Sequence, residues 1–316
     1  MRHVPVLLNE VIEQLALKPG ANVIDCTLGD AGHAEKILEK IVPDGKLLGI
    51  DADIEAILCA KKYLYNFEGQ VIFVRDNFVN LQKIVAEQKF GPVNGILLDL
   101  GWSSPQFEER GRGFSFEKSD EPLDMRYGLQ IADCRLQNKT AGELVNELSE
   151  SELEKIFREY GEEKLSKEIA KAIKETKTEI KTVGELVSII LEVYRKKLKT
   201  NKEVPWVGGL HPATKVFQAL RIAVNDELGV IEKVLPQAVE ALAPQGRLAI
   251  ITFHSLEDRI VKHFFQKASF GSGSGLSKTI KIITKKPIVC SKEEWDANPR
   301  ARSAKLRVVE KLEIRN

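Results

Sequence analysis

The chain has 316 residues, of which 43% are hydrophobic and 29% charged, and its 47 basic and 46 acidic side chains leave a formal net charge of +1. At roughly 150 residues per domain, this length predicts about two domains. The composition is that of a soluble globular protein and excludes a wholly basic coat, although not a local basic patch. No apolar run approaches the roughly 18 residues of a membrane span, and the start of the chain lacks the features of a signal peptide. We therefore expect a cytoplasmic protein with no membrane partner.

The four cysteines, Cys26, Cys59, Cys134 and Cys290, are scattered and form no Cys-x-x-Cys pair. The sequence thus predicts neither a disulfide framework nor a zinc site, and we expect reduced thiols and no bound metal. A chain of this length can bury a sizeable core without such cross-links.

Four short apolar runs each have an aspartate at their end or within two residues of it. After a helix expected around 8–17, the strand candidates are 21–25, 46–50, 71–74 and 95–98. The acids at their ends, Asp25, Asp51, Asp76 and Asp99, are separated by 26, 25 and 23 residues. This spacing is typical of repeated strand-helix units and predicts an α/β fold with a doubly wound, mostly parallel sheet.

Ligands bind outside the carboxyl ends of the strands in such sheets. The turn with Gly29 and Gly32 lacks the spaced glycines of the dinucleotide fingerprint, which favours a smaller nucleoside over a nicotinamide cofactor and its oxidoreductase chemistry. Asp51 is placed to accept hydrogen bonds from two ribose hydroxyls, or else to cap the next helix. Asp76 and Phe78 could hold an adenine, although a lone phenylalanine is more often a core residue.

The strand-helix rhythm stops after Asp99, and the next good strand is 247–253. Between them, Ser/Thr-x-x-Glu patterns at Thr140, Ser151 and Thr182 predict helix starts with capping boxes. Residues 150–200 carry 11 acidic and 12 basic side chains, which is typical of a solvated surface. We therefore predict a small helical domain over 108–204, inserted into a sheet domain made of 1–107 and 205–316.

The chain after the insertion should complete the sheet domain. The helix over 214–228 is apolar around most of its circumference and is expected to pack against the sheet. Residues 271–275 read as a flexible glycine-serine linker, and strands are expected within 279–284 and 305–310. The tail from 276 to 316 has 11 basic and 5 acidic residues, a net +6 that could follow phosphates.

The order of these features resembles a class I S-adenosylmethionine-dependent methyltransferase. Seven longer segments sharpen the resemblance, and they are His3–Glu10, Leu98–Gln106, Arg112–Phe116, Pro122–Arg126, His211–Leu228, Phe253–Arg259 and Asn298–Arg307. In this order they are similar to the bacterial small-subunit ribosomal RNA (cytosine-N(4))-methyltransferase family, RsmH or MraW. The resemblance covers nearly the whole chain and implies a seven-stranded Rossmann-like sheet with S-adenosyl-L-methionine as cofactor.

The resemblance also implies a reaction and a set of cofactor contacts. A methyl group would pass to the exocyclic 4-amino group of a cytidine in the decoding region of 16S ribosomal RNA, within the small ribosomal subunit. The cofactor contacts carried over are Ala31, Gly32, His33, Asp51, Phe78, Asp99 and Gln106. In the family pattern Asp-Gly-Thr-x-Gly-x-Gly-Gly-His, this chain has Cys26 and Ala31 in place of glycines, and alanine disfavours positive φ. A homo-oligomer is left open.

The chemistry is expected at Asp99-Leu-Gly-Trp102, where other amino-methyltransferases carry Asp-Pro-Pro-Tyr. By this resemblance Asp99 orients the amine and Trp102 stacks on the base, although local packing explains Trp102 equally well. His254 and Ser255 would contact the base or its sugar, or else His254 is a structural residue. The inserted domain would recognise the substrate, and the cations expected to contact phosphates, unless they pair with nearby carboxylates, are Arg112, Arg126, Arg300, Arg302, Lys305 and Arg307.

Two other functions fit the same residues. The chain could methylate an amine of another nucleic-acid base, such as one in DNA, or it could be a non-catalytic RNA-binding protein that keeps the fold. Mapping the methylated nucleotide after incubation with labelled cofactor would separate these readings.

Overall fold

The computed structural model describes residues 4–100, 111–127, 139–200, 202, 204, 206–207, 209–270 and 279–313. The chain divides into two compact units, the first made of Met1–Trp102 and Leu228–Asn316 and the second of Ser103–Glu227. The predicted boundaries lie at 107/108 and 204/205, so the second unit also takes in the 5 residues from 103 to 107 and the 23 residues from 205 to 227.

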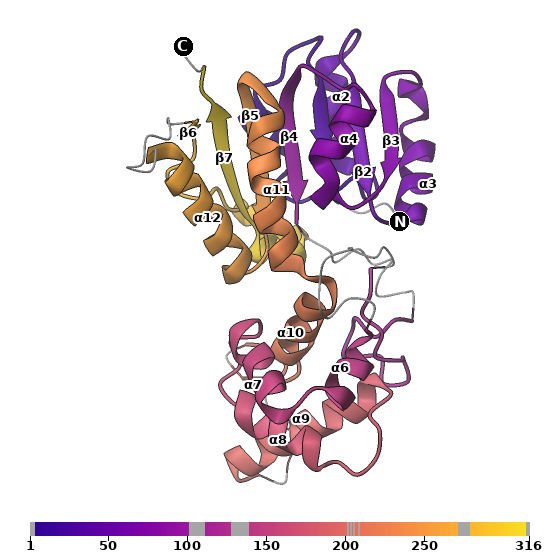
Figure 1. Cartoon of the computed structure of the whole chain (residues 1–316), viewed down its shortest axis with the longest axis vertical. Coiled ribbons are helices and arrows are strands. Elements are labelled where there is room, and N and C mark those ends of the chain that lie inside the picture. Colours follow the sequence, from indigo (N-terminus) through magenta and orange to yellow (C-terminus); the bar gives the residue numbers. More distant parts are fainter. Residues whose placement is uncertain are drawn as a thin grey trace. The chain divides into compact units, whose positions relative to one another are not determined.

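The first unit contains a seven-stranded sheet with strand order β3-β2-β1-β4-β5-β7-β6 (Figure 1). The strands are β1 (Val23–Asp25), β2 (Leu47–Asp51), β3 (Val71–Arg75), β4 (Val93–Asp99), β5 (Leu242–Thr252), β6 (Ile280–Ile282) and β7 (Lys305–Lys311). Strands β1 to β5 pair in parallel, whereas β7 is antiparallel to both β5 and β6. This confirms the predicted Rossmann-like, mostly parallel sheet.

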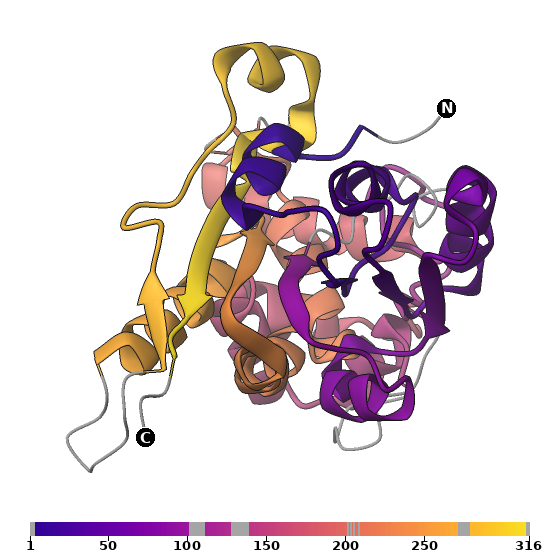
Figure 2. The same cartoon turned by 90° about the horizontal axis from the view of Figure 1, so that it is seen from above.

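Helices cover both faces of this sheet, as Figure 2 shows in a view from above. One face carries α1 (Leu8–Leu15), α2 (Gly32–Ile41) and α3 (Ile54–Tyr63), and the other carries α4 (Leu81–Glu87), α11 (Glu227–Ala241) and α12 (Ser255–Phe270). Short elements complete the unit, namely η1 (Tyr65–Phe67), η2 (Phe78–Asn80), α13 (Lys292–Ala297) and η3 (Pro299–Ser303). Strands covered on both sides need apolar residues at every position, which explains the continuous apolar runs in the sequence.

Strand β4 illustrates this double burial. Ile96, Leu97 and Leu98 are at most 1% exposed, and successive side chains point to opposite faces of the sheet. Leu97 packs in the core beneath α1 and α2, whereas Ile96 and Leu98 pack in the core beneath α4 and α11. The run ends at Asp99, the first polar side chain after it, at the carboxyl edge of the sheet.

The second unit is helical among its described residues. Its helices are α6 (Ala141–Glu147), α7 (Glu150–Glu159), α8 (Ser166–Glu175), α9 (Val183–Leu198) and α10 (Thr214–Asn225). The predicted capping boxes at Thr140 and Thr182 are confirmed. The predicted box at Ser151 is wrong: helix α7 begins two residues earlier and uses Ser149 with Glu152, because the sequence repeats the pattern in two registers.

Helix α10 is apolar around most of its circumference, as predicted, but it packs on α7 and α6 within the second unit. Its side chains therefore fill the core of that unit, rather than covering the sheet as we had expected. The predicted linker at 271–275 lies outside the described residues. None of the described helices is both long and apolar enough to cross a membrane.

Candidate functional site

The carboxyl ends of β2, β1 and β4 lie next to one another in the sheet. Each strand ends in an aspartate, and these are Asp51, Asp25 and Asp99. Because the three strands are parallel neighbours, their final residues meet at one edge, where ligands of such sheets bind. Three acids at this edge form the centre of the candidate site.

Thr27 connects two of these acids. Its backbone amide donates to Asp25 Oδ1 at 3.1 Å, and its hydroxyl accepts a hydrogen bond from the backbone amide of Asp99 at 2.8 Å. The first loop thereby fixes the position at which β4 ends. Sequence reasoning did not single out Thr27 as a site residue, although its place two residues after a strand-end aspartate was visible.

Asp25 is 1% exposed, and this burial raises the pKa of its carboxyl to about 6. The charge of His33 and the hydrogen bond from Thr27 act in the opposite direction, while the neighbouring charges of Asp99 and Asp51 raise the pKa further. The charged form of Asp25 is therefore costly in the folded chain. Asp25 supports the site from beneath.

We expect Asp25→Asn to change how stability depends on pH. A carboxyl whose folded pKa lies above its unfolded pKa stabilises the fold fully below the unfolded value, and this contribution is lost as pH rises through the folded value. Between about pH 4 and pH 7 the wild-type free energy of unfolding should fall relative to the variant by about 3 kcal/mol. Urea unfolding of both chains across this range measures the difference, and parallel pH profiles would contradict it.

Asp51 accepts one backbone hydrogen bond on each carboxylate oxygen, from Gly29 at 2.9 Å and from Asp53 at 2.9 Å. The cap of α3 is a different residue, Asp53, whose side chain accepts from the amide of Glu55. Each oxygen of an ionised carboxylate can accept a second hydrogen bond. An ionised carboxylate at this strand end suits the predicted ribose contact.

Three of the predicted cofactor contacts lie at the start of α2, with Ala31 as its N-cap and Gly32 and His33 as its first two residues. Ala31 has φ 59° and ψ 26°, so it adopts the left-handed conformation that the family pattern reserves for glycine, at a cost of about 1 kcal/mol. A Cβ atom on Gly32 would lie only 2.7 Å from Pro5 Cγ, which explains why this position must be glycine. Ala31 thus adopts a backbone conformation that glycine would adopt without this strain.

His33 is the second residue of α2 and is 6% exposed. Its Nε2 lies 2.9 Å from the carbonyl oxygen of Val6, and its Nδ1 lies 3.7 Å from Asp99 Oδ2. Burial lowers the pKa of the imidazole, against the opposing effects of Asp25, Val6 and Glu294. The neutral ring is thus set between a carbonyl and the carboxylate of Asp99, which is 21% exposed.

The end of β3 has a partly structural character. Asp76 Oδ1 accepts from the amide of Asn77 at 2.7 Å and from Asn80 Nδ2 at 2.9 Å, and so it organises its own turn. Phe78 is half-buried and packs against the core beneath α4. Its remaining exposure leaves a face for the predicted adenine contact.

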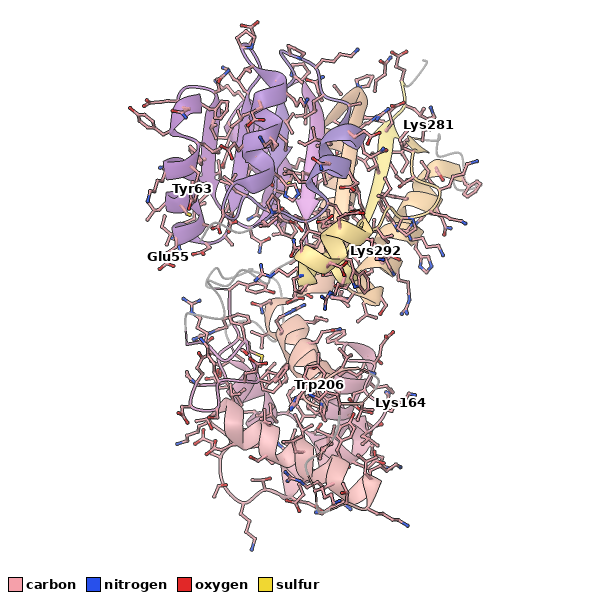
Figure 3. All side chains as sticks on the ribbon, turned by 180° about the vertical axis from the view of Figure 1, so that it is seen from behind. Glu55, Tyr63, Lys164, Trp206, Lys281 and Lys292 are labelled. Atoms are coloured by element: carbon pink, nitrogen blue, oxygen red, sulfur yellow. The ribbon has the colours of Figure 1, made fainter. Side chains whose placement is uncertain are left out.

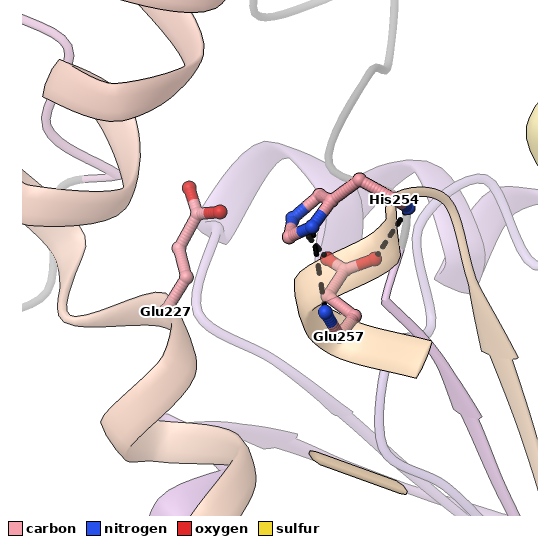
Figure 4. A group of neighbouring side chains, drawn as sticks. All are labelled: Glu227, His254 and Glu257. Carbon is pink, nitrogen blue, oxygen red and sulfur yellow. Dashed lines mark hydrogen bonds and ion pairs between the residues drawn. The ribbon is translucent and has the colours of Figure 1, made fainter. Parts of the chain in front are cut away.

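His254 is held by the first turn of α12 (Figure 4). Its Nδ1 accepts from the amide of Glu257 at 3.4 Å, while Glu257 Oε2 accepts from the amides of Phe253 and His254. His254 Nε2 lies 3.1 Å from Glu257 Oε1. The Glu257 carboxylate and His254 Nδ1 thus cap the helix, whereas His254 Nε2 makes no hydrogen bond among the described residues. The neighbouring Ser255 is exposed.

The predicted phosphate contacts in the C-terminal segment differ in how available they are. Arg307 is 8% exposed and pairs with both carboxylate oxygens of Asp258, at 2.6 and 3.1 Å. Lys305 lies 3.7 Å from the same carboxylate and is 40% exposed. Arg302 is exposed, stacks on Trp295 and donates to its carbonyl, and Arg300 is half-buried.

In the second unit, Arg126 pairs with Asp124 through two nitrogens, and Arg112 donates to the carbonyl of Arg126 at 3.0 Å. The Arg126 side chain remains 44% exposed. These neighbours hold both guanidinium groups without burying them. Trp102 and Gln106, the other predicted site residues, lie outside the described residues.

The second unit also contains a cavity of about 590 Å³ that sequence reasoning missed. Lys164, Lys197, Lys215, His211 and Tyr194 contribute to its lining. The exposed Trp206 belongs to the same unit, and Figure 3 labels it together with Lys164. Nothing in the local sequence pattern marks this cavity, because its lining comes from segments up to 52 residues apart, from Glu163 to Lys215.

Known proteins are similar to this chain over nearly its whole length. The model of the MraW methylase family matches residues 1–312. "Ribosomal RNA small subunit methyltransferase H" of Heliobacterium modesticaldum is 45% identical, and the alignment covers 98% of each chain. The protein of that name from Clostridium botulinum (strain Loch Maree / Type A3) is 46% identical, over 98% of this chain and 99% of the other.

A solved rRNA methylase from Streptococcus thermophilus covers 97% of this chain and 94% of its own, with 10% identity and a TM-score of 0.42. That likeness is too weak to support a statement about function. The family model and the relatives at 45% identity match nearly the whole chain. The chain belongs to the MraW methylase family.

Proposed function

We propose that this chain transfers a methyl group from S-adenosyl-L-methionine to the exocyclic 4-amino group of a cytidine in the decoding region of 16S ribosomal RNA. Its full-length similarity to two proteins named ribosomal RNA small subunit methyltransferase H supports an RNA substrate of the small ribosomal subunit. The observation that carries the proposal is Asp99, a half-buried carboxylate at the end of β4. Ribosomal RNA as substrate makes the cytoplasm the expected place of action.

The described residues fit this cofactor. Asp51 offers acceptors for the two ribose hydroxyls, and the glycine-like conformation of Ala31 keeps the backbone of the first loop open to the methionine portion. Phe78 would contact the adenine. Bound there, the cofactor supplies a methyl group on a sulfonium, which needs no metal. We include Gly32, His33 and Gln106 among the proposed contacts.

Asp99 would act on the amine. The lone pair of the cytosine amine is delocalised into the ring, so an acceptor for its N–H bonds helps to localise that pair on nitrogen. A fixed carboxylate also stabilises the positive charge that grows on nitrogen in the transition state. The hydrogen bond from the Asp99 amide to Thr27 holds this carboxylate in place, and positioning of the reacting atoms supplies much of the remaining rate enhancement. Trp102 would stack on the base.

His254 suits a supporting role in this reaction. Because the amide of Glu257 donates to His254 Nδ1 and the carboxylate of Glu257 accepts from the amide of His254, we propose that His254 fixes the start of α12 and thereby presents Ser255 to the RNA. The most exposed of the proposed phosphate contacts are Arg126, Arg302 and Lys305. Arg112, Arg300 and Arg307 would order the protein backbone next to these three side chains. The second unit as a whole would bind the RNA strand.

Binding of small-subunit RNA should weaken steeply with added salt. Each phosphate contact releases about one counterion, so three contacts predict a slope of roughly −2 to −3 in log K against log salt. The double variant Lys305→Gln/Arg302→Gln should reduce this slope by about 1 to 2, whereas the control Lys36→Gln on α2, paired with Glu39, should not. Filter binding between 50 and 300 mM salt gives the slopes. RNA binding that does not change with salt would contradict the proposal that these side chains contact phosphates.

The proposed reaction is tested with labelled S-adenosyl-L-methionine and three substrates. These are small subunits that lack the modification, naked 16S RNA and duplex DNA. We expect label on a single cytidine of the small subunit, identified by nuclease digestion and mass spectrometry. Label on DNA would indicate a different amino-methyltransferase, and RNA binding without label would indicate a non-catalytic protein.

A further inference from the structure

The N-terminal segment of the first unit passes over the start of α2, where Ala31 and Gly32 are proposed cofactor contacts. We call residues Val4–Leu7 the N-terminal strap. Pro5 lies against Gly32, where a Cβ atom would come within 2.7 Å of its ring. Asn298 Nδ2 donates to the carbonyl of Val4 at 3.4 Å. The strap is thus held between the start of α2 on one side and the C-terminal segment on the other.

One peptide group of the strap joins two ionisable side chains. The N–H of Leu7 donates to Glu294 Oε1 at 2.9 Å, and the carbonyl of Val6 lies 2.9 Å from His33 Nε2. This N–H and this carbonyl belong to the same peptide unit, which is planar and rigid. Glu294 therefore sets the orientation of the carbonyl that His33 meets.

The peptide also needs this support. Leu7 is fully buried and has φ 53°, a left-handed conformation that costs a leucine about 1 to 2 kcal/mol. Without an acceptor for its N–H, rotation of the peptide toward an ordinary conformation would relieve the strain. Glu294 is the acceptor that opposes this rotation.

The carbonyl of Val6 determines which nitrogen of His33 carries the proton. A carbonyl can only accept, so a neutral His33 ring must be protonated at Nε2 and must keep its lone pair at Nδ1. That lone pair lies 3.7 Å from Asp99 Oδ2. The separation is about 0.5 Å beyond a hydrogen bond, a gap that a small rotation of the carboxylate closes. The charged groups that act on His33 are Asp25, Asp99 and Glu294, all acidic, and all favour a proton on the ring.

We propose that Glu294 is a positioning residue which, through the Val6–Leu7 peptide, fixes the tautomer of His33 so that Nδ1 receives the proton released at Asp99. This inference rests on the proposed methyl transfer. The amine lone pair forms the new N–C bond, and the electrons of the broken C–S bond stay on sulfur. One N–H bond of the cationic amine then breaks, its electrons return to nitrogen, and the proton passes to the Asp99 carboxylate. From there it moves to His33 Nδ1, which leaves Asp99 ionised and His33 cationic.

Variants of Glu294 can separate its hydrogen bond from its charge. Glu294→Gln removes the charge but keeps an oxygen that can accept from Leu7. Glu294→Asp keeps the charge on a side chain one methylene shorter, which withdraws the oxygen from Leu7. Glu294→Ala removes both. Glu293→Ala is the matched control, because Glu293 is the exposed neighbouring acid on α13 and does not contact the strap.

The first readout is the tautomer of His33 in the full-length chain, measured by ¹⁵N NMR without cofactor or RNA. His33→Asn identifies the signal among the five histidines. We expect Nε2 to carry the proton in the wild type, in Glu294→Gln and in the control. In Glu294→Asp and Glu294→Ala we expect a mixture of tautomers. An unchanged tautomer in both of these variants overturns the proposal, and Glu294→Asp serves should the alanine variant fail to fold.

The second readout is turnover on small subunits. Glu294→Asp and Glu294→Ala should lower kcat about tenfold with KM for the cofactor within about twofold, whereas Glu294→Gln should stay within about threefold of wild type. A tenfold loss in Glu294→Gln with wild-type activity in Glu294→Asp would show that the charge of Glu294, not its hydrogen bond to the peptide, matters, and would refute the mechanism. An inactive wild type would instead refute the proposed function, while the NMR result would still report on the tautomer.

Discussion

Replacement of Asp99 by alanine is expected to lower kcat for RNA methylation by at least about 100-fold while the chain stays folded. The loss follows from removal of the carboxylate that orients the amine and stabilises its developing charge, an effect of about 3 kcal/mol or more. The fold should survive because the structural link of this residue, from its backbone amide to Thr27, does not involve the carboxylate. Single-turnover methylation of small subunits measures the rate, and urea unfolding measures the stability.

Two further variants make the Asp99 test specific. Asp99→Asn keeps the size and one acceptor oxygen but not the charge, so it should retain more activity than the alanine variant and still fall well below wild type. Asp44→Asn makes the same chemical change at an exposed loop position of the same unit and should leave the rate unchanged. Activity of Asp99→Ala near the wild-type level would eliminate Asp99 as the amine-orienting group.

Arg221 should give the largest effect on stability. It is 8% exposed, and its guanidinium donates to both carboxylate oxygens of Glu227 at 2.8 and 2.9 Å. The hydroxyl of Tyr127 donates to the same carboxylate at 2.6 Å, and Asn225 accepts from the amide of Tyr127 at 3.0 Å. Arg221→Met would leave Glu227 buried without its cation, so we expect the second unit to lose about 3 to 5 kcal/mol.

Hydrogen exchange with mass spectrometry can assign this loss to the second unit, because peptides from α6, α7 and α10 should exchange faster while those from the sheet should not. The double variant Arg221→Met/Glu227→Leu should recover much of the loss, since it removes both charges. Arg158→Met is the matched control: its ion pair with Glu154 is exposed and should contribute less than about 1 kcal/mol. Equal effects at Arg221 and Arg158 would show that burial of the network is unimportant.

The hydrogen bonds of Arg221 and Asn225 give a structural role to a segment that the family resemblance identified without explaining. His211–Leu228 is one of the seven segments similar to the family, and sequence reasoning treated its helix as cover for the sheet. In the structure α10 buries its apolar side chains within the second unit, Asn225 binds the backbone of residues 125 and 127, and Arg221 pairs with Glu227. Sequence similarity identified the residues correctly, but only the fold shows that they hold the inserted unit together.

The edge of the sheet was the most predictable part of the candidate site. Apolar runs that end in aspartate identify β1, β2 and β4 and their carboxyl ends, because a strand buried on both faces leaves a continuous local signal. The roles of the individual acids were not predictable in this way. Asp25 is buried beneath the site, whereas Asp51 and Asp99 remain half-exposed, and this difference depends on the helices and loops that cover each strand end.

The sequence by itself determined where the main strands lie along the chain, where the helical segment is inserted between them, and which family the chain resembles. Each of these depends on patterns within a few residues or on similarity along the whole chain. Only the tertiary structure decided which charges are paired and which are available. Arg307 meets Asp258 from 49 residues away, and Leu7 meets Glu294 from 287 residues away. No local pattern encodes such contacts, because they arise when the C-terminal segment folds back beside β5 and the N-terminal strap.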